Sequence, residues 1–392
     1  MAVTKDKNVK TNPWYFTIEH NENGERKRIK RRGFKTKKDA EAAQRALLNE
    51  LGQGLDLNAS KTLYKDFMKD CIQDKKPKVK AGTLATYTSM VNKHILPIRK
   101  NSNGKEIGLG ELALSDITPR HIQDLYNDLH ETEQLSSENI QKVHTIIKES
   151  LNKATAWNML TRNPALAVDR PKAEAKEMLY WTDEESHLFL NTCKEDRYYC
   201  AFLLALTTGM RQGEILGLRW QDVDLKNRTL SVCQILNHDG KSFDVGAKTT
   251  SGVRSIGIDK VTATKLDKLR RRTNEEKMEN RDIYEDNDLV ICTQLGTPLS
   301  PRNLNRSFSR LIDKAEVTKI RFHDMRHTHV VMLLKMRENN KRIAERMGWS
   351  SVKMLDRYAH VTPHMQKETA DAFGEMFFNA GAANGTTIAL VE

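Results

Sequence analysis

A polar, aperiodic stretch near the middle of the sequence separates two long patterned segments. Residues 168–178, VDRPKAEAKEM, are charged and carry no apolar residues at helical or strand spacing, a pattern typical of a linker between domains. The segments on either side must therefore bury separate cores. Since a chain of 392 residues is also longer than one ordinary domain, we expect two or three domains.

The apolar runs and the cysteines bear on the compartment in which the chain works. The sequence has no apolar run long enough to span a membrane, and MAVTKDKNVKTNPW at its start lacks the apolar core of a secretory signal. We therefore expect a cytoplasmic protein with no membrane partner. The cysteines lack the close pairs of a zinc site, so we expect free thiols. They are Cys71, Cys193, Cys200, Cys233 and Cys292.

The first predicted domain, residues 1–55, carries much of the positive charge. The chain has a formal net charge of +12, and residues 22–38 alone hold nine basic and two acidic residues. Such an excess favours a polyanionic partner. The strings WYFTIEH and ERKRIKRRGF, joined by the turn NENG, predict a small three-stranded sheet followed by a helix near residues 37–51.

Two interpretations of this basic segment are open. A charge run alone is more often a solvated arm, but interleaved aromatic residues such as Trp14 and Phe34 give the segment something to fold around. We therefore expect a DNA-binding module. Its predicted DNA contacts are Arg26, Lys27, Arg28, Lys30, Arg31, Arg32 and Lys35.

Residues 57–171 form the second predicted domain, a bundle of four helices. Four segments carry apolar residues three and four positions apart, and plausible N-caps precede them. These caps are Thr62, Thr83, Thr118 and Ser136. Lysines in the first connection suit either phosphate contacts or a solvated loop equally well. They are Lys75, Lys76, Lys78 and Lys80.

The third predicted domain, residues 178–392, is mainly helical with a small antiparallel sheet. Thr182 and Glu185 predict a capping box at its first helix, and TLSVCQILNHDGKSFDVGAK with VRSIGI predicts the strands. The chain as a whole is thus a multidomain α+β protein. After a Gly/Ala/Asn-rich stretch, the tail ends in an apolar strand, TTIALVE, which we expect to dock on a neighbouring subunit rather than on its own domain.

The third domain also contains an ordered set of basic and aromatic residues. Taken singly, each is better explained as a surface or packing residue, so the functional interpretation depends on their joint occurrence in one domain. They stand in TGMRQGEILGLRW, GAKTTSGVR, FHDMRHTH, MGWSS and LDRYAH. The residues are Arg211, Lys248, His323, Arg326, Trp349 and Tyr358.

This set resembles that of the tyrosine recombinases, and TGMRQGEILGLRW, FHDMRHTH and MGWSSVKMLDRYAH match the two boxes of that family. Residues 57–171 resemble its core-binding domain, and residues 11–52 resemble the arm-binding domain of lambda-type and conjugative-transposon integrases. The resemblance implies a DNA integrase that cleaves and rejoins strands through a 3'-phosphotyrosyl bond to Tyr358, and so integrates and excises a phage or another mobile element. It implies a tetramer on core-type and arm-type DNA sites, near the nucleoid, with an excisionase and a DNA-bending protein as further partners.

The chemistry of a phosphodiester explains why such a set is needed. Arg211 and Arg326 can neutralise the charge that gathers on the phosphate oxygens, in place of a metal, so we expect no metal and no cofactor. His323 can donate to the phosphate or help take the proton of Tyr358, and Trp349 can donate through its indole N–H. Many members of that family carry His at the position of Trp349. Unlike that histidine, the indole of Trp349 cannot shuttle a proton.

Further residues have supporting or no catalytic roles in this interpretation. Lys248 is the expected general acid for the leaving 5'-oxygen. Glu214, one turn after Arg211, is expected to hold the active-site cations in place. We interpret His327, His329 and His360 as structural.

Two rival functions share parts of this pattern. A type IB topoisomerase uses the same chemistry but relaxes DNA without exchanging strands, and the basic N-terminal module argues against it. A catalytically silent DNA-binding protein is the other alternative, and the full set of proposed catalytic groups argues against that one.

Overall fold

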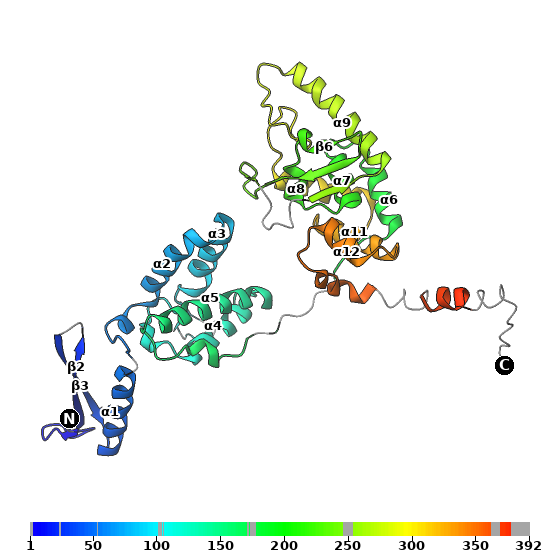
Figure 1. The fold of residues 1–392 in the computed structure, drawn as a ribbon. Coiled ribbons are helices and arrows are strands. Elements are labelled where there is room, and N and C mark those ends of the chain that lie inside the picture. Colours follow the sequence, from blue (N-terminus) through cyan, green and yellow to red (C-terminus); the bar gives the residue numbers. More distant parts are fainter. Residues whose placement is uncertain are drawn as a thin grey trace, which may run out of the picture. The chain divides into compact units, whose positions relative to one another are not determined.

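The computed structural model separates the chain into two compact units, Met1–Lys176 and Glu177–Glu392, and the boundary falls within the predicted linker (Figure 1). The described residues are 3–22, 25–52, 54–100, 104, 106–170, 172, 178–245, 254–361 and 369–377. The fold is mixed α+β, as expected, with small antiparallel sheets among a majority of helices.

The first unit begins with a three-stranded antiparallel sheet in the order β1-β2-β3, with a helix on one face. Ile18 pairs with Ile29 across the two long strands, so both side chains lie on the same face. That face packs on Ala40 and Leu47 of the helix. The predicted sheet with one helix is confirmed. Its elements are β1 (Val3–Lys5), β2 (Trp14–Glu22), β3 (Glu25–Phe34) and α1 (Lys37–Gly52).

A helical bundle with its own hydrophobic core completes the first unit. Its helices are α2 (Tyr64–Lys75), α3 (Ala81–Met90), which continues as a π-helical turn (Val91–Ile95), α4 (Pro119–Glu131) and α5 (Ser137–Ala156). Short helical turns join them at Ala59–Lys61, Lys76–Lys78, Leu114–Asp116 and Pro164–Ala167. The expectation of a purely helical segment is wrong at one point, because β4 (Arg99–Lys100) pairs with β5 (Glu106–Ile107).

The helix starts of the bundle test the predicted caps. Thr118 accepts a hydrogen bond from the amide of His121, whose ring accepts one in return from the Thr118 amide, so this cap is confirmed. Ser136 occupies the N-cap position of α5 without a side-chain bond. The prediction of Thr62 and Thr83 as N-caps is wrong, because Leu63 occupies the N-cap position of α2 and Lys80 that of α3.

The second unit alternates helices with short strands. Its helices are α6 (Asp183–Thr192), α7 (Tyr199–Thr208), α8 (Gln212–Leu216), α9 (Lys260–Glu279), α10 (Pro301–Ala315), α11 (Asp324–Lys335) and α12 (Asn340–Met347), with 3-10 turns at Trp220–Asp222 and, as η8, at Val352–Val361. Its strands are β6 (Val223–Asp224), β7 (Thr229–Val232), β8 (Gln234–Leu236), β9 (Phe243–Val245) and β10 (Arg254–Gly257). They form a sheet in the order β10-β7-β6 and a separate β8-β9 hairpin.

A cluster of aromatic rings lies at the centre of the second unit. Phe308 of α10 contacts four of these rings, with centroid separations from 5.4 to 5.8 Å. These neighbours are Trp181, Phe189, Phe202 and Phe322. The predicted capping box fixes the start of α6 against this cluster, since Thr182 and Glu185 exchange bonds of 2.9 and 3.2 Å.

A second, smaller apolar cluster joins α11, α12 and the turn η8. Val330 and Val331 of α11 and Met347 of α12 are fully buried in it, and Tyr358 belongs to it. The same cluster that fixes these helices therefore also holds the predicted nucleophile. Beyond it, the structure describes a helix at residues 369–377, whereas the predicted apolar strand TTIALVE lies outside the described residues.

Two further findings concern the membrane and the thiols. Within the described parts of the chain, no helix combines the length and the apolar character that a membrane crossing requires. All five cysteines are free; four are buried and Cys233 is partly exposed.

Phe308→Ala should destabilise the second unit by about 3–5 kcal/mol, because it opens a cavity at the centre of the aromatic cluster. Chemical denaturation followed by tryptophan fluorescence reports on this unit through Trp181, which contacts Phe308. Phe373→Ala is the matched control, since Phe373 is 59% exposed. Equal midpoints for the two variants would contradict the assignment of Phe308 to the core.

Candidate active site and DNA-binding surface

A buried carboxylate organises the cations of the candidate active site. Glu214 is 2% exposed and lies 2.8 Å from Nη1 of Arg211 and 2.8 Å from Nη2 of Arg254. Burial opposes its ionisation, but the hydrogen bonds and charge of Arg254, together with Arg211, lower the pKa of Glu214 to about 2. Glu214 is therefore ionised and bridges the guanidinium groups of Arg211 and Arg254.

Arg211 stands at the N-cap of α8, and the local geometry fixes its backbone. Its amide donates to Oε2 of Glu214 at 2.9 Å, so this amide is engaged within the protein rather than turned to a ligand. The side chain remains 41% exposed. Arg211 thus combines a fixed backbone with an accessible guanidinium, and contact with a phosphate requires both.

Arg326, in the first turn of α11, is buried between two helix ends. Its Nη1 donates to the carbonyl of Gly209 and its Nη2 to the carbonyl of Met347, each at 2.5 Å. Burial and repulsion by Arg211 lower the pKa of Arg326 to about 9, so the guanidinium stays charged at neutral pH. These bonds fix its position relative to α7 and α12.

Gly209 allows the close approach on which this anchor depends. It ends α7 with a φ of +65°, a conformation that side chains with a Cβ rarely adopt. A Cβ there would lie 2.7 Å from Cδ2 of His329 and 2.8 Å from Sδ of Met347. The glycine of TGMRQG is therefore required by packing as well as by the turn.

Tyr358 lies in this neighbourhood with its ring buried. It is 2% exposed; its ring centroid is 6.2 Å from that of Trp349, over which the Arg326 guanidinium lies at 5.8 Å. Burial raises the pKa of Tyr358 to about 12, although the positive charges of Arg326 and Arg357 oppose the rise. The phenol is thus protonated at neutral pH, and the positive charge of the Arg326 guanidinium acts on it.

His327, interpreted from the sequence as structural, has a contact that the sequence did not predict. Its Nδ1 lies 2.6 Å from the Tyr358 hydroxyl, so this imidazole contacts the predicted reactive atom directly. His323 caps the same helix, and the two imidazole rings are 5.3 Å apart. Burial and the charge of Arg326 lower the pKa of His323, and burial with the neighbouring His323 lowers that of His327 to about 4.

His329 does have the structural position that the sequence suggested. Its Nδ1 lies 2.7 Å from the carbonyl of Leu206, and its Nε2 accepts a hydrogen bond from Arg346 at 3.0 Å. Burial lowers the pKa of His329 to about 3, so it is neutral and can hold both bonds. Lys248 and the side chain of His360 lie outside the described residues.

Sequence reasoning missed Arg254 and Arg346 as well as the contact of His327. Arg254 donates to the Arg346 carbonyl at 2.8 Å as well as to Glu214, and Arg346 donates to the Thr207 carbonyl at 2.8 Å. Neither arginine had a signal, because an arginine on a short strand or amphipathic helix looks like a surface residue. The sequence did offer a signal for His327, because this residue directly follows Arg326, the arginine of the His-x-x-Arg motif.

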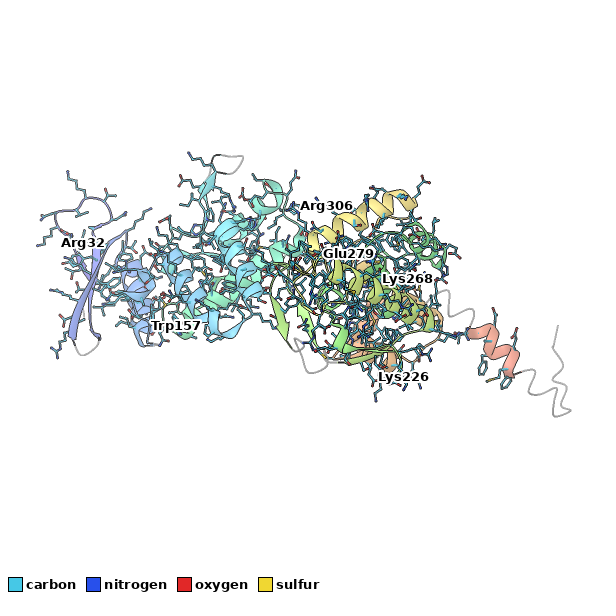
Figure 2. All side chains as sticks on the ribbon, turned by 90° about the horizontal axis from the view of Figure 1, so that it is seen from above. Arg32, Trp157, Lys226, Lys268, Glu279 and Arg306 are labelled. Carbon is cyan, nitrogen blue, oxygen red and sulfur yellow. The ribbon has the colours of Figure 1, made fainter. Side chains whose placement is uncertain are left out.

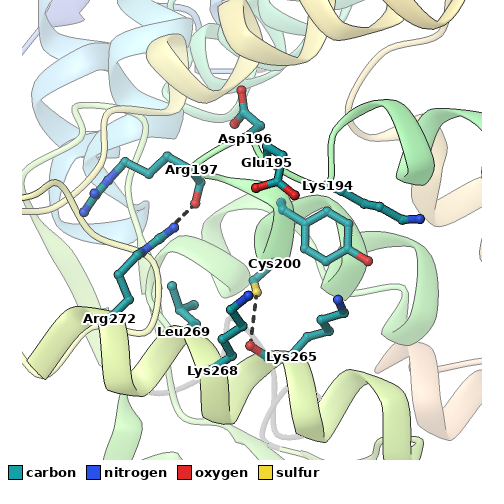
Figure 3. A pocket seen from close by; sticks show the side chains of 10 residues that line it. Lys194, Glu195, Asp196, Arg197, Cys200, Lys265, Lys268, Leu269 and Arg272 are labelled. Atoms are coloured by element: carbon teal, nitrogen blue, oxygen red, sulfur yellow. Dashed lines mark hydrogen bonds between the residues drawn. The ribbon is translucent and has the colours of Figure 1, made fainter. Parts of the chain in front are cut away.

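A separate cavity of about 310 Å³ opens between the start of α7 and α9 (Figure 3). Basic residues dominate its lining, and the Arg272 guanidinium donates to the carbonyl of Arg197 across it at 3.1 Å. None of its lining residues belongs to the Arg326 and Tyr358 neighbourhood. The candidate site is therefore not this cavity. The basic and acidic lining residues are Lys194, Glu195, Asp196, Arg197, Lys265, Lys268 and Arg272.

The basic hairpin of the first unit presents charge on one face. Strand alternation places one set of basic residues away from the helix α1, whereas Arg31 pairs with Phe16 on the helix-facing side. The Lys30 ammonium also lies 4.2 Å from the centroid of the Tyr15 ring. Arg32 is labelled on this hairpin in Figure 2. The outward residues are Arg26, Arg28, Lys30 and Arg32, all exposed.

The predicted lysines of the bundle fall into two groups. Lys75 lies 2.8 Å from Glu149 and 4.5 Å from the centroid of Tyr87, so it is engaged within the bundle. Lys76, Lys78 and Lys80 are exposed at the turn after α2. Among the residues with described positions, no group of three or more His, Cys, Asp or Glu side chains could hold a metal ion.

Solved structures of two integrases share this fold. The Tn1549 transposon integrase, in complex with a circular intermediate DNA, has a TM-score of 0.63 and 20% identity over 79% of this chain and 99% of that one. A lambda integrase dimer bound to a COC' core site has a TM-score of 0.59 and 16% identity over 91% and 93% of the two chains.

The chain belongs to the phage integrase family. Residues 179–365 match that family, residues 63–130 its N-terminal SAM-like domain, and residues 4–51 an arm DNA-binding domain. A tyrosine recombinase XerC-like protein of Caldanaerobacter subterraneus is 28% identical over 92% of this chain and 95% of its own length. The ICEBs1 integrase of Bacillus subtilis is 29% identical over 80% and 82%. The chain is therefore a tyrosine-type site-specific recombinase.

Glu214→Gln should lower the free energy of unfolding by about 3 kcal/mol at neutral pH, since two guanidiniums lose their buried charge partner. Folding lowers the pKa of Glu214 from 4.5 to about 2. The contribution is therefore present above about pH 4.5 and is lost as the pH falls toward 2. Urea denaturation of both proteins over this range measures the difference; a gap that does not narrow in acid would contradict the assignment.

Proposed function

We propose that this recombinase integrates and excises a mobile element by forming a 3'-phosphotyrosyl bond between DNA and Tyr358. The observation that carries the proposal is the position of the Tyr358 ring, next to Trp349 and within the field of the Arg326 guanidinium. A surface tyrosine or an ordinary core tyrosine has no reason to lie beside a buried cation. A phenol that must become a phenolate has such a reason, because a nearby positive charge favours its ionised form.

The two arginines would neutralise the phosphate. In strand cleavage the five-coordinate transition state concentrates negative charge on the non-bridging oxygens. Arg326 uses two of its five N–H groups on carbonyls of the described residues, which leaves further donors for those oxygens. Arg211 adds its half-exposed guanidinium. Their mutual repulsion, which lowers the pKa of Arg326, would be relieved when an anion lies between them.

The remaining groups would complete the transfer. His323 and the Trp349 indole supply hydrogen-bond donors to the phosphate, and Lys248 protonates the leaving 5'-oxygen. One ester replaces another, so bond energy is kept and no ATP is consumed. Rejoining is the same reaction reversed with a different 5'-hydroxyl, which exchanges strands and distinguishes a recombinase from a topoisomerase.

We assign a separate role to each of three segments of the chain. Residues 1–55 would bind arm-type sites, residues 57–171 core-type sites, and residues 178–392 would carry out catalysis. Four subunits would assemble on two duplexes, as a lambda integrase tetramer does on a Holliday junction. The tail from Gly385 onward would dock on a neighbouring subunit, and an excisionase and a DNA-bending protein would set direction. The site of action would be host DNA in the bacterial cytosol, at the nucleoid.

Tyr358→Phe should abolish the covalent protein–DNA adduct on a nicked suicide substrate while leaving DNA affinity within about twofold of the original, because only the nucleophilic oxygen is lost. Denaturing gel electrophoresis of reactions in EDTA detects the adduct. Tyr180→Phe, in the same apolar cluster, is the matched control and should form the adduct. An adduct that survives the change at Tyr358 would identify a different nucleophile and refute the proposal.

The outward face of the hairpin should account for arm-site affinity. Replacing Arg28, Lys30 and Arg32 together with alanine should reduce the salt dependence of arm-site binding by about 2.7 in log–log slope, at about 0.9 for each lost phosphate contact. Core-site cleavage should persist. The matched control removes three exposed cations from the helix side of the same module. These are Lys37, Lys38 and Arg45.

Fluorescence anisotropy over a range of salt concentrations measures both triple variants on the same arm-site duplex. The proposal requires that the hairpin variant lose slope and the helix variant keep it. Equal losses in the two variants would show that the module binds through overall charge alone, and no loss in either would remove it from DNA binding.

A further inference from the structure

Tyr358 has a proton acceptor in contact with its hydroxyl. The distance from the hydroxyl to Nδ1 of His327 is 2.6 Å, and the two ring centroids are 5.7 Å apart. The His327 side chain is only 13% exposed. A short bond between two largely buried groups fixes both rings, so the contact is a defined feature of the site and not an encounter of two surface side chains.

The Asp324 carboxylate favours one tautomer of His327. Arg321 binds the Asp324 carboxylate through its amide at 2.8 Å, its Nε at 3.0 Å and its Nη2 at 2.8 Å. The carboxylate oxygen of this fixed pair lies 4.0 Å from Nε2 of His327. A carboxylate on that side favours the proton on Nε2, which leaves the Nδ1 lone pair to accept the hydrogen bond from the phenol.

We propose that His327 is the general base that accepts the proton of Tyr358 during strand cleavage and returns it during strand joining. The proposal rests on the role of Tyr358 as the nucleophile. In cleavage the phenol proton moves to Nδ1 while the phenolic oxygen bonds to phosphorus. The bond from phosphorus to the 5'-oxygen breaks, and that oxygen takes a separate proton from the general acid. In joining, imidazolium returns its proton to the departing phenolic oxygen.

Position favours His327 over His323 for this role. His327 lies 2.6 Å from the Tyr358 hydroxyl, whereas the ring contact recorded for His323 is with His327, at a centroid distance of 5.3 Å. His323 remains suited to the phosphate. His327 is neutral at physiological pH, because its pKa is about 4, and its acceptor nitrogen is available. The charged and titratable groups around it are Arg321, His323, Asp324, Arg326 and Tyr358.

A bound phosphodiester would strengthen this base when it is needed. Desolvation and the cations around His327 weaken it as a proton acceptor, and an anion placed between Arg211 and Arg326 offsets those cations. Asp324 adds its negative charge on the opposite edge of the ring. The proton transfer would therefore become favourable only on DNA, which protects the phenol from reaction elsewhere.

The pH dependence of cleavage tests the proposal with the full-length chain on a nicked suicide substrate. Above the ordinary pKa of histidine, about 6.5, His327 stays neutral even when bound DNA strengthens it as a base, so the single-turnover rate of the unmodified protein should be nearly flat between about pH 7.5 and 8.5. His327→Ala should cleave about 10²–10⁴ times more slowly at neutral pH. Its rate should rise about tenfold per pH unit, because only the phenolate fraction then reacts. A flat profile for the variant would overturn the proposal.

A substrate with sulfur in place of the scissile 5'-oxygen separates the two proton transfers. A thiolate leaves without a proton, so Lys248→Ala should be rescued by this substrate. His327→Ala should not be, because its defect lies on the tyrosine side. Equal rescue of the two variants would place His327 on the leaving-group side and refute the assignment.

His329→Gln is the control for a purely structural defect. It removes a buried imidazole of the same helix that bonds to Leu206 and Arg346 and not to the phenol, so stability should fall while the pH profile stays flat. The unmodified protein and Tyr358→Phe accompany every series. If the unmodified protein forms no adduct, the proposed function fails; if it does and His327→Ala matches it, only this inference fails.

Discussion

The attraction between the Glu214 carboxylate and the guanidiniums of Arg211 and Arg254 is the interaction on which the second unit depends most. Several cations must lie close together to bind one phosphate, and like charges in a weakly polar interior repel strongly. A single ionised carboxylate, 2.8 Å from each of two guanidiniums, offsets that repulsion. Arg326 has no such carboxylate partner among the described residues and is held by carbonyl oxygens instead. Its burial, together with repulsion by Arg211, lowers its pKa.

The apolar cluster around α11 and α12 has two tasks that are physically linked. It packs Val331, Ile343 and Met347 to fix the helices that carry Arg326, and it also encloses the ring of Tyr358. The same burial that stabilises the helices raises the pKa of the phenol. The protonated state of the Tyr358 phenol is thus a consequence of the same packing that holds Arg326 in place.

The predictions from sequence differ in quality for identifiable reasons. The sheet with one helix, the Thr118 and Thr182 caps and the mixed fold were predicted correctly, because alternation, helical periodicity and capping are local signals. The β4-β5 pair was missed because each strand has two residues, too few to show a period. Thr83 was wrong as a cap because α3 begins earlier, at Ala81. The proposed catalytic set was recognised from its resemblance to that of the tyrosine recombinases, and its separate roles remain predictions.

The sequence by itself determined the division into units, the basic hairpin and the identity of the residues able to bind a phosphate, since these depend on composition and on neighbours in the chain. Only the tertiary structure decided which partners those residues have. Arg254 meets Glu214 across 40 residues and His327 meets Tyr358 across 31. Such contacts arise where helices and strands pack, and the residues that meet there are chosen by shape and burial, which no local spacing records.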